Sequence, residues 1–233
     1  MKSDAYSRKI KDIIKNAAKY HEAFYNNYKT GIFAGPALYF HRKSIEKLGA
    51  KDFEKYIEYI YATLVAWGMH RMGEKGAKMQ DFETFLKSIL PLMDDIKKAR
   101  MMRLERKDSI DYKVIENIFK NINVMKSKTR LVGNSKVMAH LLPDLIPPVD
   151  RNYTLKYLKE SISINNKIDK EWNLLKDLLD NFFNPIATNS QFLKKARKWL
   201  KNQARYIWDT SIPKIIDNLI IGRSLLKLKS RNF

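Results

Sequence analysis

Apolar side chains recur at intervals of three and four residues along most of this 233-residue chain. This period places them on one face of an α-helix, whereas a half-exposed strand would alternate in steps of two. The first run, within residues 4–28, comprises Ile10, Ile14, Ala17, His21, Phe24 and Tyr28. No stretch keeps a strand-like alternation, and the eight glycines and seven prolines are few for a β-rich protein of this length. The sequence therefore predicts an all-α fold.

Acidic and amide side chains mark the expected helix starts, because they can accept hydrogen bonds from the free N–H groups of a first turn. Such residues precede apolar runs at Asp52, Asp81, Asp111, Asp169 and Asn189. Prolines should interrupt helices at Pro91 and at Asn184-Pro185, and Pro213 should lie in the first turn of the last helix. We expect roughly ten helices around one cleft, in a single domain of residues 1–233 that could divide into two lobes near residues 103–110.

The charge balance is strongly basic, with 45 Lys and Arg against 25 Asp and Glu and a formal net charge of +20. Such an excess favours a polyanionic partner, above all nucleic acid. The alternative is a lysine-rich genomic composition that raises the basic residues everywhere. Two clusters argue against a uniform background. Residues 97–107 contain six basic residues with Glu105 as the one acid, and residues 194–233 contain 11 with Asp209 and Asp217 as the acids. On a helix, residues 97–107 would form a positive ridge suited to a nucleic-acid backbone.

Residues 126–154 combine more unusual features than any other segment. The segment begins with three basic residues and no acid among them: Lys126, Lys128 and Arg130. The pair Gly133-Asn134 is a turn signal, since both residues tolerate a positive φ, and Ser135 could then cap an apolar helix. The free N–H groups at the start of that helix would make the corner of Gly133, Asn134, Ser135 and Lys136 a phosphate site.

A stiff loop follows this apolar helix. Pro143 should end the helix, and Pro147-Pro148 restricts how the chain approaches Asp150. Asp150 stands where a further helix should begin, with Tyr153 in its first turn. One interpretation of Asp150 is therefore an N-terminal helix cap.

The segment also resembles the core of the helix-hairpin-helix DNA glycosylases, through L-V-G-N-S-K at 131–136, the apolar helix, the proline loop and V-D at 149–150. In that family the hairpin binds DNA phosphates, a lysine at its end can attack the sugar C1′, and an aspartate after the loop activates the nucleophile. The resemblance implies a hairpin element near residues 126–150, with Lys136 as the nucleophile and Asp150 as the activating carboxylate. Ser135 replaces the second hairpin glycine. Together with W-G-M-H-R-M-G at 67–73 and I-I-D-N at 215–218, the segment also resembles a protein family without an assigned activity.

The segment at 67–73 supplies further candidate residues. A tryptophan, a histidine and an arginine together could stack on a base and hold a phosphate. The alternative is an ordinary helix C-terminus, where the tryptophan packs in the core and the cations interact favourably with the helix dipole. We expect Arg71 and Arg151 to contact nucleic acid. The residues expected to line a pocket are Trp67, His70, His140 and Tyr153.

Other classes of site are disfavoured by the composition. The chain has no cysteine, and its four histidines are scattered without a metal-ligand spacing, so we expect neither a metal nor a cofactor. No P-loop motif is present, and sparse carboxylates disfavour a two-metal nuclease. The N-terminus lacks the apolar core of a signal peptide, and no apolar run approaches a membrane span. These features predict a cytoplasmic protein without a membrane partner.

Three functions remain open from the sequence. The leading hypothesis is a DNA glycosylase, with or without lyase activity, that acts on a modified base; such an enzyme needs a pocket, a carboxylate and an amine. The second is a non-catalytic helical module that binds DNA or RNA, with DNA the preferred partner. The third is a helical interaction protein whose ligand is unknown and whose basicity is background. A phosphate-binding protein would lose affinity steeply as salt rises, which separates the second hypothesis from the third.

Overall fold

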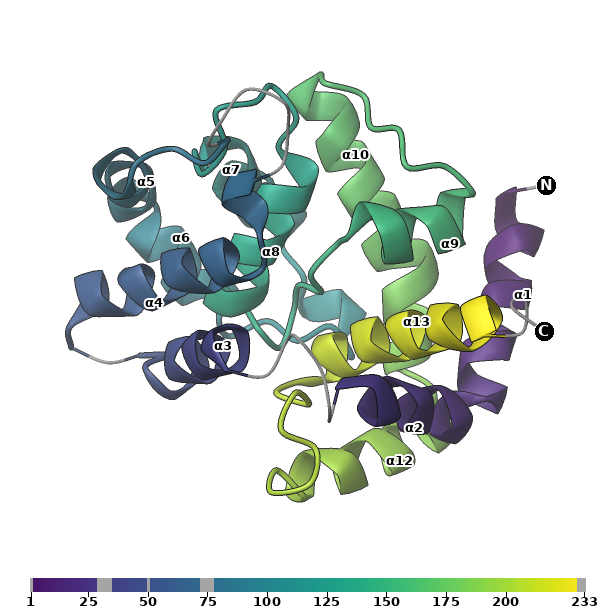
Figure 1. Ribbon diagram of the computed structural model, residues 1–233. Helices are drawn as coiled ribbons and strands as arrows, with labels where there is room; N and C mark the ends of the chain where they lie inside the picture. The colour runs from purple at the N-terminus through teal and green to yellow at the C-terminus, as the bar shows by residue number, and fades with distance from the viewer. Residues whose placement is uncertain (1, 29–34, 50, 72–77, 230–233) are drawn as a thin grey trace.

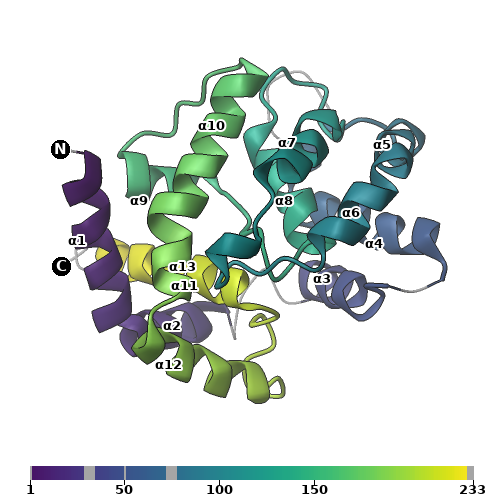
Figure 2. The ribbon, with the colours of Figure 1, turned by 180° about the vertical axis from the view of Figure 1, so that it is seen from behind.

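A computed structural model describes residues 2–28, 35–49, 51–71 and 78–229. Within these ranges the regular structure is helical, and the one β-type pairing is an isolated antiparallel bridge between Met79 and Met125. The predicted all-α class is confirmed. Figure 1 shows the helices gathered into two groups, and Figure 2 shows the same division from behind.

The first group contains the helices from the middle of the chain. Its elements are α3 (Pro36–Glu46), α4 (Phe53–Ala66), the 3-10 turn η1 (Met69–Arg71), α5 (Phe82–Ile89), the 3-10 turn η2 (Leu90–Leu92), α6 (Met93–Ala99), the 3-10 turn η3 (Lys107–Ser109), α7 (Tyr112–Asn121) and α8 (Leu131–Leu141). Helices α3 and α4 pack closely, and α8 contacts α4 and α7.

The second group combines both ends of the chain. Its elements are α1 (Lys2–Lys15), α2 (Ala17–Tyr28), the π-helical turn η4 (Arg151–Leu155), α9 (Lys156–Lys159), α10 (Ile168–Leu178), the π-helical turn η5 (Leu179–Phe183), α11 (Asn184–Ala187), α12 (Ser190–Lys201) and α13 (Ile212–Lys229). The chain therefore leaves this group after α2 and returns to it after α8 (Figure 1).

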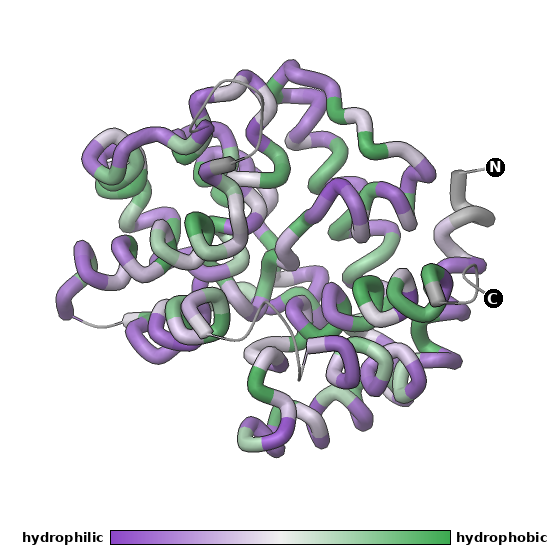
Figure 3. The backbone as a smooth tube through the Cα atoms, viewed as in Figure 1, coloured by the Kyte–Doolittle hydropathy of each residue, from purple (hydrophilic) through white to green (hydrophobic). Residues whose placement is uncertain are grey.

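Helix α13 lies at the centre of the second group, where it packs along α2. Its residues from Ile212 to Ile221 are all buried, and Figure 3 shows the helix coloured largely as hydrophobic. One continuous cluster of buried side chains runs from Tyr6 in α1, through the first group, to Ile220 in α13. A smaller cluster around Phe24 and Trp208 joins α2, α3 and α13. The two groups of helices thus share one apolar core.

Most predicted helix starts are confirmed. Asp52, Asp81, Asp111 and Asn189 each accept a hydrogen bond from a backbone N–H in the first turn of the following helix. Asp169 lies within the first turn of α10. Pro91 falls in η2 and separates α5 from α6, and Pro213 lies in the first turn of α13. These helix starts were predictable because a cap or a proline acts on residues within one turn of itself in the sequence.

Two predicted elements are wrong, and the condition for a third is not met. Residues 4–28 form two helices, because the chain bends at Asn16, whose amide donates to the Asp12 carboxylate and carbonyl. Asn184-Pro185 does not break the chain: α10, η5 and α11 follow one another without a gap, and the π-helical turn η5 interrupts the regular α-helical bonding directly before Pro185. Residues 97–107 do not form one helical ridge, since α6 ends at Ala99.

Candidate functional site

The site is built around α8, and its first turns differ from the predicted hairpin. Gly133, Asn134 and Ser135 lie inside the helix and are buried, so the turn predicted at Gly133-Asn134 is wrong. A Cβ on Gly133 would collide with the side chain of Met125 and crowd that of Val124. The glycine is needed for this close approach and not for a positive φ.

The two polar neighbours of Gly133 hold the surrounding chain in place. The Asn134 amide donates to the carbonyls of Phe119 (2.7 Å) and Ile122 (3.0 Å). The Ser135 hydroxyl accepts from the Val149 N–H at 3.1 Å, which fixes the residue before Asp150. Burial removes all three residues from contact with nucleic acid, and this corrects their assignment as phosphate ligands.

The N-terminus of α8 is already occupied by a carboxyl side chain of the protein. One carboxylate oxygen of Glu171, on α10, accepts from the backbone N–H groups of Arg130 (2.6 Å) and Leu131 (2.5 Å). Burial raises the pKa of Glu171, although these two N–H groups oppose the increase. The phosphate site predicted at the start of this helix is therefore filled by the protein's own carboxyl group.

The structure brings Lys136 and Asp150 together. Lys136 projects from the second turn of α8, and its Nζ lies 3.1 Å from Oδ2 of Asp150. The lysine side chain is 11% exposed and the aspartate side chain 28%. The same ammonium lies 5.7 Å from the centre of the Trp67 ring and 3.8 Å from the sulfur of Met69. The pair is thus nearly enclosed on the lysine side and open to solvent on the aspartate side.

Asp150 also caps the following helical turn. Its Oδ1 accepts from the N–H groups of Asn152 (2.8 Å) and Tyr153 (3.4 Å), while Oδ2 faces Lys136. Partial burial raises the pKa of Asp150, but the Lys136 ammonium and the two N–H groups lower it by more, so the net pKa lies below its ordinary value. Asp150 is therefore ionised at neutral pH. The predicted cap is confirmed, and it coexists with the ion pair.

A second buried ion pair lies beside the first. Lys214 and Asp217, on α13, are 2.7 Å apart, with side chains 11% and 5% exposed. Burial raises the pKa of Asp217; Lys214 opposes this, and the charges of Asp150 and Lys136 both act on Asp217. Sequence reasoning did not assign these two residues. The available signal was a Lys and an Asp three positions apart within a helix of otherwise buried isoleucines and leucines.

Two histidines support α8 from the buried side. His140 Nδ1 donates to the Lys136 carbonyl at 2.8 Å, and its Nε2 lies 3.0 Å from Nδ1 of His41. Burial lowers the pKa of His140 to about 4 and lowers that of His41 as well. A neutral His140 must accept through Nε2, so His41 donates from Nδ1. His140 is 1% exposed. It therefore supports the backbone at Lys136 and does not line an open pocket as predicted.

The remaining basic candidates have different environments. Lys126 and Lys128 are exposed and can meet a partner. Arg130 donates to the Asn123 side chain at 2.6 Å, so it is used within the fold. Arg151 is half-buried, and its positive charge acts on Glu171. The side chain of Arg71 lies outside the described residues.

The three aromatic candidates Trp67, His70 and Tyr153 have different neighbours. Trp67 ends α4 and faces Lys136, as described above. His70 donates from Nδ1 to the Val65 carbonyl at 3.0 Å, as expected for a residue that closes a helix end. Tyr153 is half-buried; burial and the charge of Asp150 raise its pKa, which keeps its hydroxyl protonated at neutral pH.

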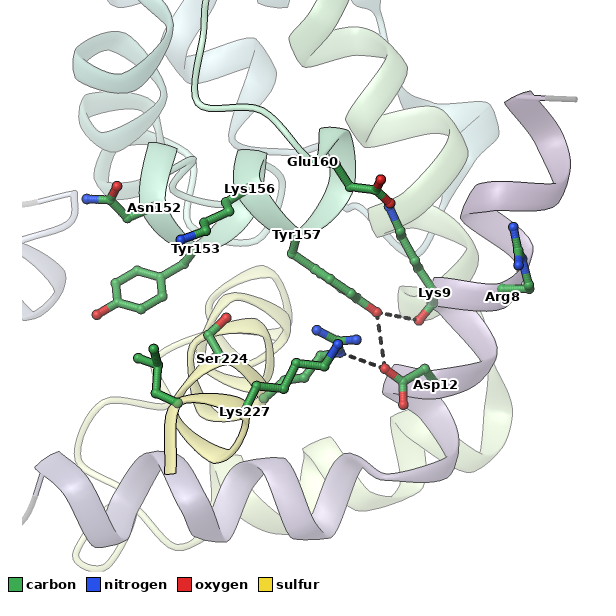
Figure 4. A pocket seen from close by; sticks show the side chains of 12 residues that line it. Arg8, Lys9, Asp12, Asn152, Tyr153, Lys156, Tyr157, Glu160, Ser224 and Lys227 are labelled. Atoms are coloured by element: carbon green, nitrogen blue, oxygen red, sulfur yellow. Dashed lines mark hydrogen bonds and ion pairs between the residues drawn. The ribbon is translucent and has the colours of Figure 1, made fainter. Parts of the chain in front are cut away.

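A groove of about 870 Å³ begins at Asn152 and Tyr153, the residues that follow Asp150, and Figure 4 shows it from close by. Its other walls come from α1, α9 and α13. This volume falls in the range of ligand pockets, about 300–1,000 Å³. No group of three or more metal-ligating side chains occurs among the described residues, and none of the described helices is long and apolar enough to span a membrane.

Comparison of the chain with protein-family models, curated proteins and solved structures found no match. The candidate site is therefore defined by its own geometry: two neighbouring Lys–Asp pairs, a supporting histidine pair and an adjoining groove.

Proposed function

We propose that the protein binds nucleic acid and acts as a DNA glycosylase/lyase-like enzyme on a modified base, with Lys136 as nucleophile and Asp150 as its carboxylate partner. The observation that carries the proposal is the 3.1 Å contact between Lys136 Nζ and Asp150 Oδ2. The family resemblance implies these two roles for residues 14 positions apart in sequence. The proline loop and the hydrogen bond that the Val149 N–H donates to the Ser135 hydroxyl bring Asp150 next to Lys136, which supports the proposal.

The chemistry requires a neutral amine. The Lys136 nitrogen would form a bond to the sugar C1′ as the bond from C1′ to the base breaks and its electron pair leaves with the base, which takes up a proton. Ring opening, with a proton transferred to O4′, then gives an imine. Exclusion of water by a bound nucleotide would favour proton transfer from the ammonium to Asp150, since desolvation disfavours both charges. After the transfer, Asp217 would remain as a second buried carboxyl group close to the amine.

The surroundings suit an extruded base. Such enzymes move the target base out of the stack and hold it between apolar or aromatic side chains. Trp67 lies against Lys136, and Tyr153 follows Asp150. The net charge of +20 would attract the polyanionic substrate at long range.

Borohydride trapping on duplexes that carry abasic, uracil, oxidised or alkylated positions tests the proposal. Wild-type protein should form a covalent adduct with at least one duplex, because borohydride reduces the imine to a stable amine. Lys136→Gln should form none, whereas Lys113→Gln, which removes an exposed lysine charge on α7 outside the candidate site, should behave as wild type. An adduct of equal yield in Lys136→Gln would exclude Lys136 as the nucleophile.

A second function is favoured by one specific observation: both carboxylate oxygens of Asp150 are already used, one by Lys136 and one by the cap of η4. In a non-catalytic nucleic-acid-binding module the pair would only hold α8 against η4. Salt-sensitive binding without any adduct or released base would support this second function and count against the first.

A further inference from the structure

The groove beside Asp150 has a charge pattern of its own. Four basic side chains besides Arg223 line it, against two acids; the residues are Arg8, Lys9, Lys156 and Lys227, with Asp12 and Glu160. Side chains from α1, from the segment η4–α9 and from α13 face this space in Figure 4. The groove is thus assembled from three elements that are distant in sequence.

Two of the basic residues that line the groove, Arg223 and Lys9, are paired with its two acids. Arg223 Nε donates to Asp12 Oδ2 at 2.7 Å, and its guanidinium lies 4.0 Å from the centre of the Tyr157 ring. Lys9 Nζ lies 3.1 Å from the Glu160 carboxylate and also donates to the Leu158 carbonyl. Both acids of the groove are therefore already paired.

Two cations on the walls lack such a partner. Arg8 and Lys156 are exposed, and neither forms a salt bridge with any described residue. Unpaired cations beside half-buried aromatic rings are the features with which proteins hold the phosphates and bases of a single strand. Tyr153 supplies such a ring at the end of the groove nearest Asp150.

We propose that this groove binds a single-stranded stretch of nucleic acid, with phosphates on Arg8 and Lys156 and a base stacked on Tyr153. The proposal rests on the nucleic-acid partner of the proposed function and assigns the path of the strand. A strand in the groove would reach Asp150 directly, because Asn152 and Tyr153 belong both to the groove and to the turn that Asp150 caps.

Titration of a labelled single-stranded deoxyoligonucleotide by fluorescence anisotropy tests the path. Arg8→Gln/Lys156→Gln should weaken binding by about tenfold or more at low salt and reduce the slope of log K against log salt by about 1.4, or 0.7 for each lost phosphate contact. Both residues are exposed, so the variant should keep the wild-type fold. Tyr153→Leu should weaken binding by about tenfold through lost stacking, with a smaller change of slope.

Lys194→Gln/Lys198→Gln is the matched control, since it removes two exposed charges from α12, which does not line the groove. Equal losses in the two double variants would overturn the proposal, because binding would then follow net charge alone. Displacement by a mononucleotide at the same concentration as the oligonucleotide would also overturn it, in favour of a small phosphate ligand.

The outcome can be separated from that of the proposed function. If the groove variant alone loses affinity but wild type gives no borohydride adduct, the groove holds nucleic acid and the enzyme proposal fails. If wild type is trapped through Lys136 while the groove variant binds normally, the enzyme proposal stands and the strand takes another path.

Discussion

At the scale of single residues, His140 makes two hydrogen bonds that require a neutral ring. It donates to the Lys136 carbonyl and accepts from His41, and protonation would place a second donor against the His41 donor. Its pKa of about 4 in the folded state lies below the unfolded value of about 6.5. Between these two values the unfolded chain binds more protons, so stability falls as the pH is lowered.

We therefore expect the free energy of unfolding to be unaffected by His140 above about pH 6.5 and to fall by up to about 3 kcal/mol toward pH 4. Urea denaturation across this range measures the loss. Because other groups also titrate, the decisive quantity is the difference between wild type and His140→Gln. A difference that does not change between pH 7 and pH 4.5 would contradict the assignment of a neutral histidine.

The pair Lys214–Asp217 should behave as a coupled unit. Asp217→Leu leaves the Lys214 ammonium buried without a carboxylate and should cost about 3–5 kcal/mol of stability. Lys214→Met/Asp217→Leu removes both charges and should recover most of that loss, since paired removal from a core is often neutral. Urea denaturation of Asp217→Leu, Lys214→Met and the double variant gives the coupling free energy between the two charges. Additive losses would show that the two charges do not depend on each other.

At the scale of secondary-structure elements, the carboxylate of Glu171 fixes the start of α8 and hence the position of Lys136. Glu171→Ala would leave the partly buried Arg130 N–H and the buried Leu131 N–H without an acceptor and should destabilise the fold by about 2 kcal/mol or more. Glu116→Ala removes the acid of a surface pair with Lys120 on α7 and should cost less than about 1 kcal/mol. Chemical denaturation of both variants compares them. Equal losses would show that the cap contributes no more than a surface pair.

Two glycines show how helix packing limits substitution. A Cβ on Gly222 of α13 would collide with the backbone carbonyl of Tyr20 on α2, whereas a Cβ on Gly133 meets the flexible side chain of Met125. Gly222→Ala should therefore cost more stability than Gly133→Ala, by about 1–3 kcal/mol, although alanine is the better helix former. Thermal and urea unfolding test the order. A Gly222→Ala protein as stable as wild type would mean that α13 can move away from α2 at no cost.

Gly133 also shows where prediction from the sequence stops. The caps at Asp52, Asp81 and Asp111 were predictable because a cap needs only its own first turn. Gly133 is equally compatible with a turn and with a crowded helix, and the choice depends on Met125, which meets it only in the folded chain. The resemblance implied roles for Lys136 and Asp150, but the sequence left open whether the two side chains meet, and only the fold brings them into contact. Lys214 and Asp217 escaped assignment because their spacing also fits an exposed pair, and their burial depends on the packing of α13 against other helices.

At the scale of the whole molecule, some of the described basic residues have an acidic partner close by in the same helix and others have none. Helix α12 carries five basic residues and no acid, whereas the lysines Lys43, Lys55, Lys97 and Lys120 each pair with an acid three or four positions away. Locally paired lysines add little to the long-range field. The basic residues of α12, Lys126, Lys128 and the two unpaired cations of the groove have no such local acid among the described side chains, so they contribute to the positive field in full.

The shared core decides how the molecule unfolds. The sequence predicted one domain that could divide near residues 103–110, and one cluster of buried side chains runs through both groups of helices. Loss of either group would expose the apolar faces of the other, so we expect a single cooperative transition. Trp67 lies in the first group. Trp172 and Trp208 pack against rings of that group, Phe119 and His41, whereas Trp199 stacks on His21 within the second group.

Urea unfolding of Trp67→Phe/Trp172→Phe/Trp208→Phe, followed by the fluorescence of the remaining Trp199, reports on the second group, while far-ultraviolet circular dichroism reports on all helices. The two curves should coincide in midpoint and slope. A fluorescence midpoint displaced from that of the dichroism would show that the groups unfold separately. In that case the contact between Lys136 on α8 and Asp150 would join two independently stable lobes, and a ligand held between them would have to stabilise both.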